Sequence, residues 1–345
     1  MKTTILTCAA VVLGVVLAAP DAHAQLTETP ERSGTAAAEY LLLPVTAQGA
    51  ALSSAYTGGM DNIMGLEGLT VNPAALMSNL GTSAMFSRTE YVADVGTNHF
   101  GVAQAFGNNN VALTLTSWDY GDIEVTTVDD PENLANLTYS ASNLVLGASV
   151  ARQFTDRMSA GVTSKVIYEE IDDMSASTIA FDAGMTYAVG ESGLRFGISL
   201  RNFGPAMAYG GNGLDQDIPI VGSSDGIAGG IATADAELPS LLNIGASYTR
   251  EFAGDVSFTG LATFRSNAYD ADEYALAGQL GYADLVMVRG GYQFRNDMDQ
   301  TFYQGWNVGG GLNYQAGTTR ISVDYAYRGT DYFDGVNLFT VGVGF

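Results

Sequence analysis

Apolar and polar residues alternate along most of the chain from residue 83 onward. A period of two is typical of β-strands, whose successive side chains point to opposite faces of a sheet. The pattern predicts strands at residues 83–92, 97–106, 110–127, 142–154, 158–170, 177–188, 193–203, 240–252, 255–266, 273–282, 284–295, 302–315, 318–328 and 335–345. These are roughly fourteen strands, an even number as in single-chain bacterial β-barrels.

The last strand gives the strongest indication of a closed barrel. Its bulky apolar residues share one face, and the other face is small or weakly polar; the apolar set is Phe339, Val341, Val343 and Phe345. A sheet edge cannot stay unpaired in hydrocarbon, so such a strand has to close the barrel by pairing with the first strand. Taken alone, it also fits the edge of a soluble sandwich. The rest of the chain favours a transmembrane antiparallel β-barrel.

The predicted connections alternate between short and long. Tight turns are predicted at residues 107–109, 155–157, 190–193, 253–254, 283 and 316–318, and longer, mostly acidic loops around 128–141, 171–176, 204–239, 267–272, 296–301 and 329–334. Outer-membrane barrels have short turns on the periplasmic side and long loops outside. Both barrel ends are therefore predicted to be periplasmic.

Charged residues in the middle of strands fall on the face opposite the apolar one. In a membrane barrel this face lines the lumen, where water or partner charges solvate it. The predicted lumen network is Lys165, Glu169, Asp182, Arg195, Arg201, Arg265, Arg289, Arg295 and Asp324. We expect a mainly structural network of ion pairs, and a ladder that guides a substrate is the alternative.

The first residues predict export. Lys2 precedes an apolar run from Ala9 to Ala19, and an A-x-A cleavage site ends at Ala24, so residues 1–24 are predicted to be a signal peptide. The run is shorter than the about 20 residues that a spanning helix needs. The single cysteine, Cys8, lies within this signal, which leaves no disulfide or thiol chemistry to the mature chain.

Residues 25–82 lack the strand pattern and contain small residues that suit short helical turns. A segment of this size before the first strand is either a periplasmic extension or a plug in the lumen. The predicted organisation is a tail and lumen hatch at 25–82, followed by the barrel at 83–345.

Composition supports a membrane barrel and excludes some partners. Apolar residues make up 47% and charged residues 15%, with 42 Gly, 18 Tyr and 15 Phe. Soluble domains have about 25% charged residues, and membrane barrels carry aromatic girdles. Lys and Arg number 14 against 37 Asp and Glu, a net charge of −23, which excludes binding nucleic acid through phosphates.

Catalytic and cofactor signals are weak. The mature chain has one histidine, His99, in an alternating segment, and no nucleophile can be paired with it from the sequence. We therefore expect no enzyme, no cofactor and no metal site. The acidic loops offer oxygen ligands for Ca²⁺, but their spacing matches no defined calcium loop, so solvated loop charges are favoured.

Several segments together resemble a known family. Tyr40-Leu41, Gly49-Ala50 and Ser54-Ala55 are followed by Asn72-Pro73-Ala74, and then by residues 89–94 (TEYVAD) and 118–123 (WDYGDI). In this order they resemble the PorV/PorQ-type outer-membrane proteins, relatives of the FadL-like long-chain fatty acid transporters. The resemblance implies a fourteen-stranded barrel with an N-terminal hatch, which Asn72, Pro73 and Ala74 anchor. Alternatively, those three residues form only a turn before the first strand. Residues 44–48 (PVTAQ) lack the basic residue often seen before the Gly-Ala step, which puts any shared hatch contact there in doubt.

Three functions compete on these grounds. The first is a conduit for small hydrophobic molecules, which would first meet apolar residues of the long loop: Phe203, Met207, Tyr209, Ile218 and Ile220. The second is a barrel associated with type IX secretion that binds or shuttles secreted cargo. The third, an outer-membrane enzyme, lacks an acid–base pair. Expected partners are outer-membrane lipid, the barrel-assembly machinery, and either a hydrophobic ligand or secretion-system proteins.

Overall fold

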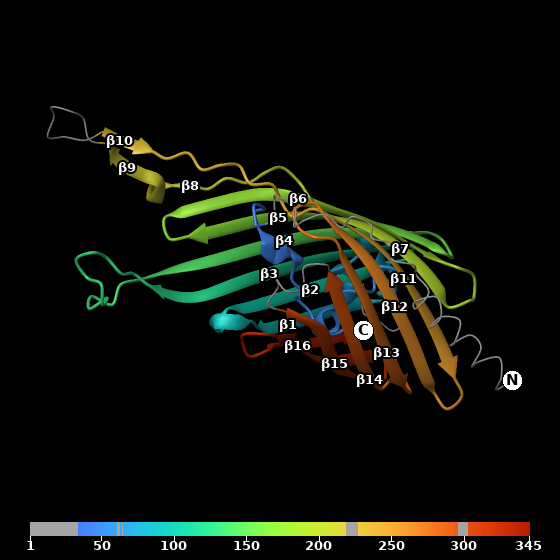
Figure 1. The fold of residues 1–345 in the computed structure, drawn as a ribbon. Coiled ribbons are helices and arrows are strands. Elements are labelled where there is room, and N and C mark those ends of the chain that lie inside the picture. The colour runs from blue at the N-terminus through green and yellow to red at the C-terminus, as the bar shows by residue number, and fades with distance from the viewer. Residues whose placement is uncertain (1–33, 61–62, 64, 219–226, 296–302) are drawn as a thin grey trace, which may run out of the picture.

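A computed structural model describes residues 34–60, 63, 65–218, 227–295 and 303–345. Within these residues fourteen antiparallel strands form the wall of a closed barrel (Figure 1). They are β1 (Thr82–Glu90), β2 (Gly96–Phe106), β3 (Asn109–Glu124), β4 (Thr138–Thr155), β5 (Met158–Ile171), β6 (Met174–Ala188), β7 (Leu194–Phe203), β11 (Leu241–Phe252), β12 (Val256–Asn267), β13 (Glu273–Tyr282), β14 (Val286–Arg295), β15 (Tyr303–Ala316), β16 (Thr319–Thr330) and β17 (Val336–Gly344). The predicted signal peptide lies outside the described residues.

The last wall strand closes the barrel against the first. β17 pairs with β1 from Gly344 opposite Ser83 to Asn337 opposite Glu90. The other neighbours pair in chain order, and β7 pairs directly with β11. The predicted transmembrane antiparallel β-barrel is therefore confirmed.

The alternation of side chains gives the barrel an apolar exterior. Phe339 and Val341 on the closing strand are each 48% exposed, and Phe345 at the end of the chain is 64% exposed. Large apolar side chains are exposed in the same way on every other wall strand. Such a surface is stable in lipid and would be costly in water. No helix among the described residues is long and apolar enough to cross a membrane.

The wall is taller on one side. β3 has 16 residues and β4 has 18, against 9 for β17. About 9–11 residues suffice to cross a bilayer, so the longer strands of this side have residues to spare beyond one crossing. In Figure 1 β3 to β6 project at the end where β8 to β10 lie. Strands that reach into water do not need an apolar face, which explains why their alternation fades in the sequence.

This extension corrects the prediction for residues 171–176. These were expected to form a longer loop, but β5 and β6 pair up to Ile171 opposite Met174, which leaves a two-residue turn. Asp172 adopts a φ of 51°, a left-handed conformation that Asp tolerates well in tight turns. The serines at the start of β6 lack the apolar alternation on which the prediction relied.

The long loop between β7 and β11 contains structure of its own. β8 (Gly210–Gly211) pairs with the start of β6, and η4 (Asn212–Leu214) follows it. β9 (Asp215–Ile218) and β10 (Ile227–Gly230) form a separate antiparallel pair, which projects from the barrel in Figure 1. A further connection, between β1 and β2, contains η3 (Val92–Asp94).

The described residues before β1 lie inside the barrel and form the hatch. The hatch contains η1 (Glu39–Leu42), α2 (Ala47–Ala51), α3 (Gly65–Leu69) and η2 (Pro73–Ser78). Thr46 caps α2 by accepting a hydrogen bond from the Gly49 amide at 3.2 Å. α2 packs on β14 to β17, α3 on β1 and β2, and η2 on β3 to β6.

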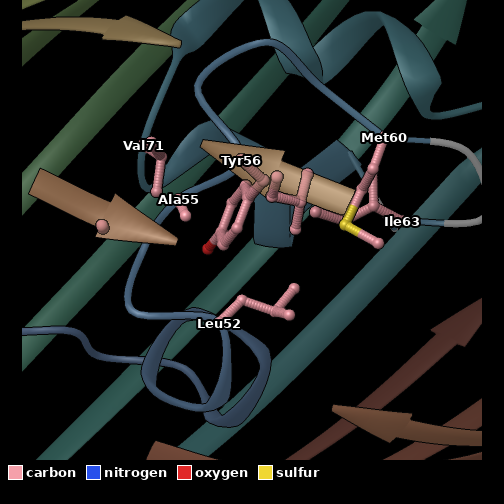
Figure 2. Packing of buried hydrophobic residues seen from close by; sticks show 8 residues of the cluster. Leu52, Ala55, Tyr56, Met60, Ile63 and Val71 are labelled. Atoms are coloured by element: carbon pink, nitrogen blue, oxygen red, sulfur yellow. The ribbon is translucent and has the colours of Figure 1, made fainter. Parts of the chain in front are cut away.

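The hatch has an apolar core shared with the wall. Leu52, Ala55, Tyr56, Met60, Ile63 and Val71 pack together, as Figure 2 shows, with Leu261 and Ala275 of β12 and β13. Tyr56 is fully buried, and its hydroxyl donates to the carbonyl oxygen of Glu67 at 3.4 Å. This core fills the middle of the lumen with side chains.

Candidate functional site

The lumen contains two adjoining cavities that share residues of the hatch. Segment 39–45, which we call the strap, supplies most of the shared lining. Residues common to both cavities are Tyr40, Leu42, Leu43, Pro44 and Ser54. A molecule that moves between the two cavities therefore has to pass the strap.

The outer cavity lies toward the long loops and has a volume of about 470 Å³. Its lining combines aromatic rings, amides and charges: Glu39, Tyr40, Leu42, Leu43, Pro44, Ala50, Ser53, Ser54, Tyr91, Arg265, Asn267, Asp270, Glu273, Gln293, Arg295, Tyr303, Gly305, Asn307 and Arg328. Arg265 pairs with Glu273 at 2.6 Å, and Arg295 pairs with Asp270 at 2.5 Å.

Arg328 differs from these two arginines in its surroundings. Its guanidinium carbon lies 3.4 Å from the centre of the Tyr303 ring, and Nη2 donates to Gln293 Oε1 at 3.3 Å. No carboxylate of the described residues forms an ion pair with it. The outer cavity thus has one cation held by a ring and an amide.

The inner cavity is smaller and mostly apolar on the hatch side. It has a volume of about 90 Å³, and its apolar lining is Leu41, Leu42, Leu43, Pro44, Val45, Leu69, Trp118 and Val145. Lys165 also lines it and binds Asp182 at 2.6 Å and Asn202 Oδ1 at 2.8 Å. Engineered cavities of about 150 Å³ with apolar walls bind benzene, so the inner cavity takes a small group or one end of a larger molecule.

Three polar atoms of residues that line the inner cavity have no hydrogen-bond partner among the described residues. These are the hydroxyl of Tyr40, Nε2 of His99 and Nε of Arg201. The other ring nitrogen of His99 hydrogen-bonds with Thr116 Oγ1 at 2.8 Å, and Arg201 donates through Nη2 to the Leu41 carbonyl at 3.5 Å. Within the described part of the chain the partner of His99 is this threonine hydroxyl, and no carboxylate bonds to the ring.

The wall holds the hatch through side chains that bond to the hatch backbone. Asn110 donates to the carbonyls of Leu76 and Asn79 at 2.9 and 2.8 Å. Further bonds run from Ser199 to Val71 O (2.9 Å), Ser247 to Gly59 O (2.6 Å), Thr263 to Ala55 O (2.9 Å), Asn307 to Ser53 Oγ (2.7 Å) and from the Ala47 amide to Thr340 Oγ1 (2.8 Å). Apart from the bond between Asn307 and Ser53, which joins two side chains, these bonds satisfy backbone groups that would otherwise be buried unpaired.

Inward-facing glycines let the hatch approach the wall. A Cβ at Gly161 would lie 2.6 Å from the Pro73 carbonyl carbon, and one at Gly291 would lie 2.6 Å from Ser53 Oγ. Gly184 and Gly197 meet the hatch at least as closely. These glycines provide seats for the hatch, which alternation of apolar and polar residues does not reveal.

The predicted anchor residues lie at such seats. Asn72 is fully buried, accepts from the Ala74 amide at 3.0 Å, and donates to the carbonyls of Thr57 at 2.8 Å and Met185 at 3.2 Å. Pro73 begins η2, where its missing amide proton costs nothing. The tripeptide therefore both starts a helix and contacts the wall.

In the structure the residues of the predicted lumen network form separate clusters and not one network. Lys165 pairs with Asp182, and Arg289 pairs with Asp324 and donates to Gln279 Oε1 at 2.7 Å. Arg265 and Arg295 bind acids outside the predicted set, as described above. Glu169 accepts a hydrogen bond from Tyr209, Arg201 contacts the strap, and Arg195 is half-buried at the start of β7.

A buried carboxyl in the hatch escaped the sequence analysis. Glu67 of α3 is 2% exposed, and neither of its carboxyl oxygens has a hydrogen-bond partner among the described residues. Burial, reinforced by the charge of Asp324, raises the pKa of Glu67 to about 8, although Thr46 and Arg289 act in the opposite direction. Glu67 is therefore mostly protonated at neutral pH.

The predicted apolar contacts of the long loop do not form one surface. Met207 is buried with Ala38, Val145 and Ile167, whereas Phe203 is 62% exposed on the outer face of β7. Tyr209 bonds to Glu169, as noted. Ile218 ends β9, and Ile220 lies outside the described residues.

Comparison with solved structures shows the same fold in outer-membrane proteins. A FadL homologue from Pseudomonas aeruginosa matches with a TM-score of 0.52 and 12% identity, covering 87% of this chain and 97% of its own. The Pseudomonas putida toluene transporter TodX matches with a TM-score of 0.47 and 13% identity, covering 85% and 96%. No protein-family model and no curated protein matches the sequence.

At such identities the likeness concerns the fold alone. It places this chain among transmembrane barrels of the FadL-like architecture. The finer resemblance to PorV/PorQ-type proteins and the role in type IX secretion stay predictions from the sequence.

Proposed function

We propose that the protein is a conduit in the bacterial outer membrane that admits small hydrophobic molecules into its lumen. The observation that carries this proposal is the inner cavity, whose hatch side is mostly apolar and which adjoins the larger outer cavity at the strap. The likeness of the fold to the FadL homologue supports the same class of function. In this proposal residues 1–24 are removed on export, and the long loops face the exterior.

The hatch packs against the wall within the lumen, and in this proposal passage requires the hatch or the wall to move. The hatch is fixed by hydrogen bonds and by the close contacts at the glycine seats, each of which is local. We propose that a ligand enters from the long-loop end, reaches the strap, and occupies the inner cavity before any such movement.

The test is uptake into liposomes that contain the reconstituted protein. Val145 lines the inner cavity, and its neighbour Leu146 is 49% exposed on the lipid face. Val145→Trp fills the cavity and is expected to reduce uptake of a small hydrophobic probe several-fold relative to wild type. Leu146→Trp adds the same ring on the lipid face and is expected to leave uptake unchanged. Equal uptake by the two variants would refute the route.

A further inference from the structure

Among the described residues, the outer cavity presents a buried cation, Arg328, without an anionic partner. Arg328 is 8% exposed and lines the cavity, and the ion pairs of the described residues leave it out. The two other arginines of the cavity are already neutralised by Glu273 and Asp270. A buried charge that lacks a partner is unfavourable, and an anion entering the cavity would relieve this.

The guanidinium of Arg328 is held in a fixed orientation. It lies over the Tyr303 ring, whose hydroxyl hydrogen-bonds with that of Tyr91, and Gln293 accepts one of its N–H groups. A planar guanidinium fixed in this way has donors left for a second group and matches the two oxygens of a carboxylate.

The other residues that line the cavity indicate the chemistry of the uncharged part of the ligand. Tyr40 and Tyr91 line the cavity with aromatic rings, and Asn267 and Asn307 line it with amides. An aromatic ring would pack on the tyrosines, and a hydroxyl on it would bond to the amides, whereas a plain alkyl chain would offer the amides no such group. We propose that the outer cavity binds a hydroxylated aromatic carboxylate, with its carboxylate on Arg328.

This inference goes beyond the conduit, because binding in the outer cavity does not require passage through the hatch. It assigns the cavity a preference for an anion, whereas the proposed conduit admits hydrophobic molecules in general. A chain that binds the anion and transports nothing would refute the conduit and leave this inference intact.

The experiment is isothermal titration of the purified full-length protein in detergent with 4-hydroxybenzoate. The neutral 4-hydroxybenzamide tests the charge, and octanoate tests the ring. We expect 4-hydroxybenzoate to bind, and the amide and octanoate each to bind about tenfold more weakly or worse, the loss expected for a charge-assisted pair. Binding of the amide or of octanoate as tight as that of 4-hydroxybenzoate overturns the proposal, as does no binding at all.

A pair of variants places the carboxylate. Arg328→Gln is expected to weaken 4-hydroxybenzoate binding about tenfold or more, with little change for the amide. Arg152→Gln removes an exposed arginine that also lies over a ring, Phe154 at 5.8 Å, and is expected to bind as wild type does. Unchanged affinity in Arg328→Gln overturns the assignment. If that variant does not give a heat-modifiable band on a gel, the ligand series on wild type decides alone.

Discussion

Replacing Glu67 by Gln should stabilise the protein at neutral pH. The carboxyl is buried in the hatch, close enough to Asp324 for its charge to be felt, and Arg289 is already engaged by Asp324. Tyr56, whose hydroxyl bonds to the backbone of Glu67, is the other titratable group that interacts with it. An amide has nearly the shape of the protonated acid and carries no charge at any pH.

The size and sign of the effect follow from the pKa. In the unfolded chain Glu67 titrates near 4.5, and in the folded protein near 8. Its contribution to stability is fully present below 4.5, declines as the pH rises, and is lost once the pH passes 8. At 1.36 kcal/mol for each pKa unit, the loss is about 3 kcal/mol at pH 7 and about 5 kcal/mol above pH 8.

The assay is urea unfolding in detergent micelles between pH 5 and pH 9, followed by tryptophan fluorescence. Wild type should lose stability over this range relative to Glu67→Gln, and the two should converge near pH 5. Glu170→Gln removes an exposed carboxylate of β5 and is expected to follow wild type. Parallel curves for wild type and Glu67→Gln across the whole range would show that the buried carboxyl is compensated by contacts that we have not identified.

Three further predictions concern the wall. Gly291→Val, which forces a Cβ against the hatch, should make the hatch sensitive to added protease, whereas Gly290→Val, with its nearest atom at 3.9 Å, should not. Thr340→Val removes the partner of the α2 amide and should lower the urea-unfolding free energy by about 1–3 kcal/mol, with Thr340→Ser as the control. Lys165→Met leaves Asp182 without its cation and should cost about 3–5 kcal/mol in the same assay. A cost of less than about 1 kcal/mol would mean that water or another group replaces the lysine.

The wall was predictable because its signal is local. Each strand crosses lipid once, so residues of the apolar and polar faces alternate along the sequence, as from Ile321 to Tyr327 of β16. Where strands leave the membrane, as at the β5–β6 turn, both faces meet water and the signal disappears. The boundaries were therefore least accurate at the tall side of the barrel.

The site was less predictable because its contacts are distant in sequence. Alternation places Arg289, Arg295 and Arg328 on the inward face, but which acid each one meets depends on neighbouring strands and on the hatch. Asn307 bonds to Ser53 across more than two hundred residues, and no local pattern connects the two. Besides the Asn72-Pro73-Ala74 tripeptide, glycines at inward positions of strands, such as Gly291, were an available signal for hatch contacts.

The packing of the hatch links the two ends of the chain to a single assembly step. η2 rests on strands made early, β3 to β6, whereas α2 rests on β14 to β17, the last to be synthesised. The seat for α2 is complete only when β17 is in place, and the same strand closes the barrel against β1. Docking of the plug and sealing of the cylinder therefore need the same strand, and a chain shortened before it would leave an open seam and an incomplete seat for α2.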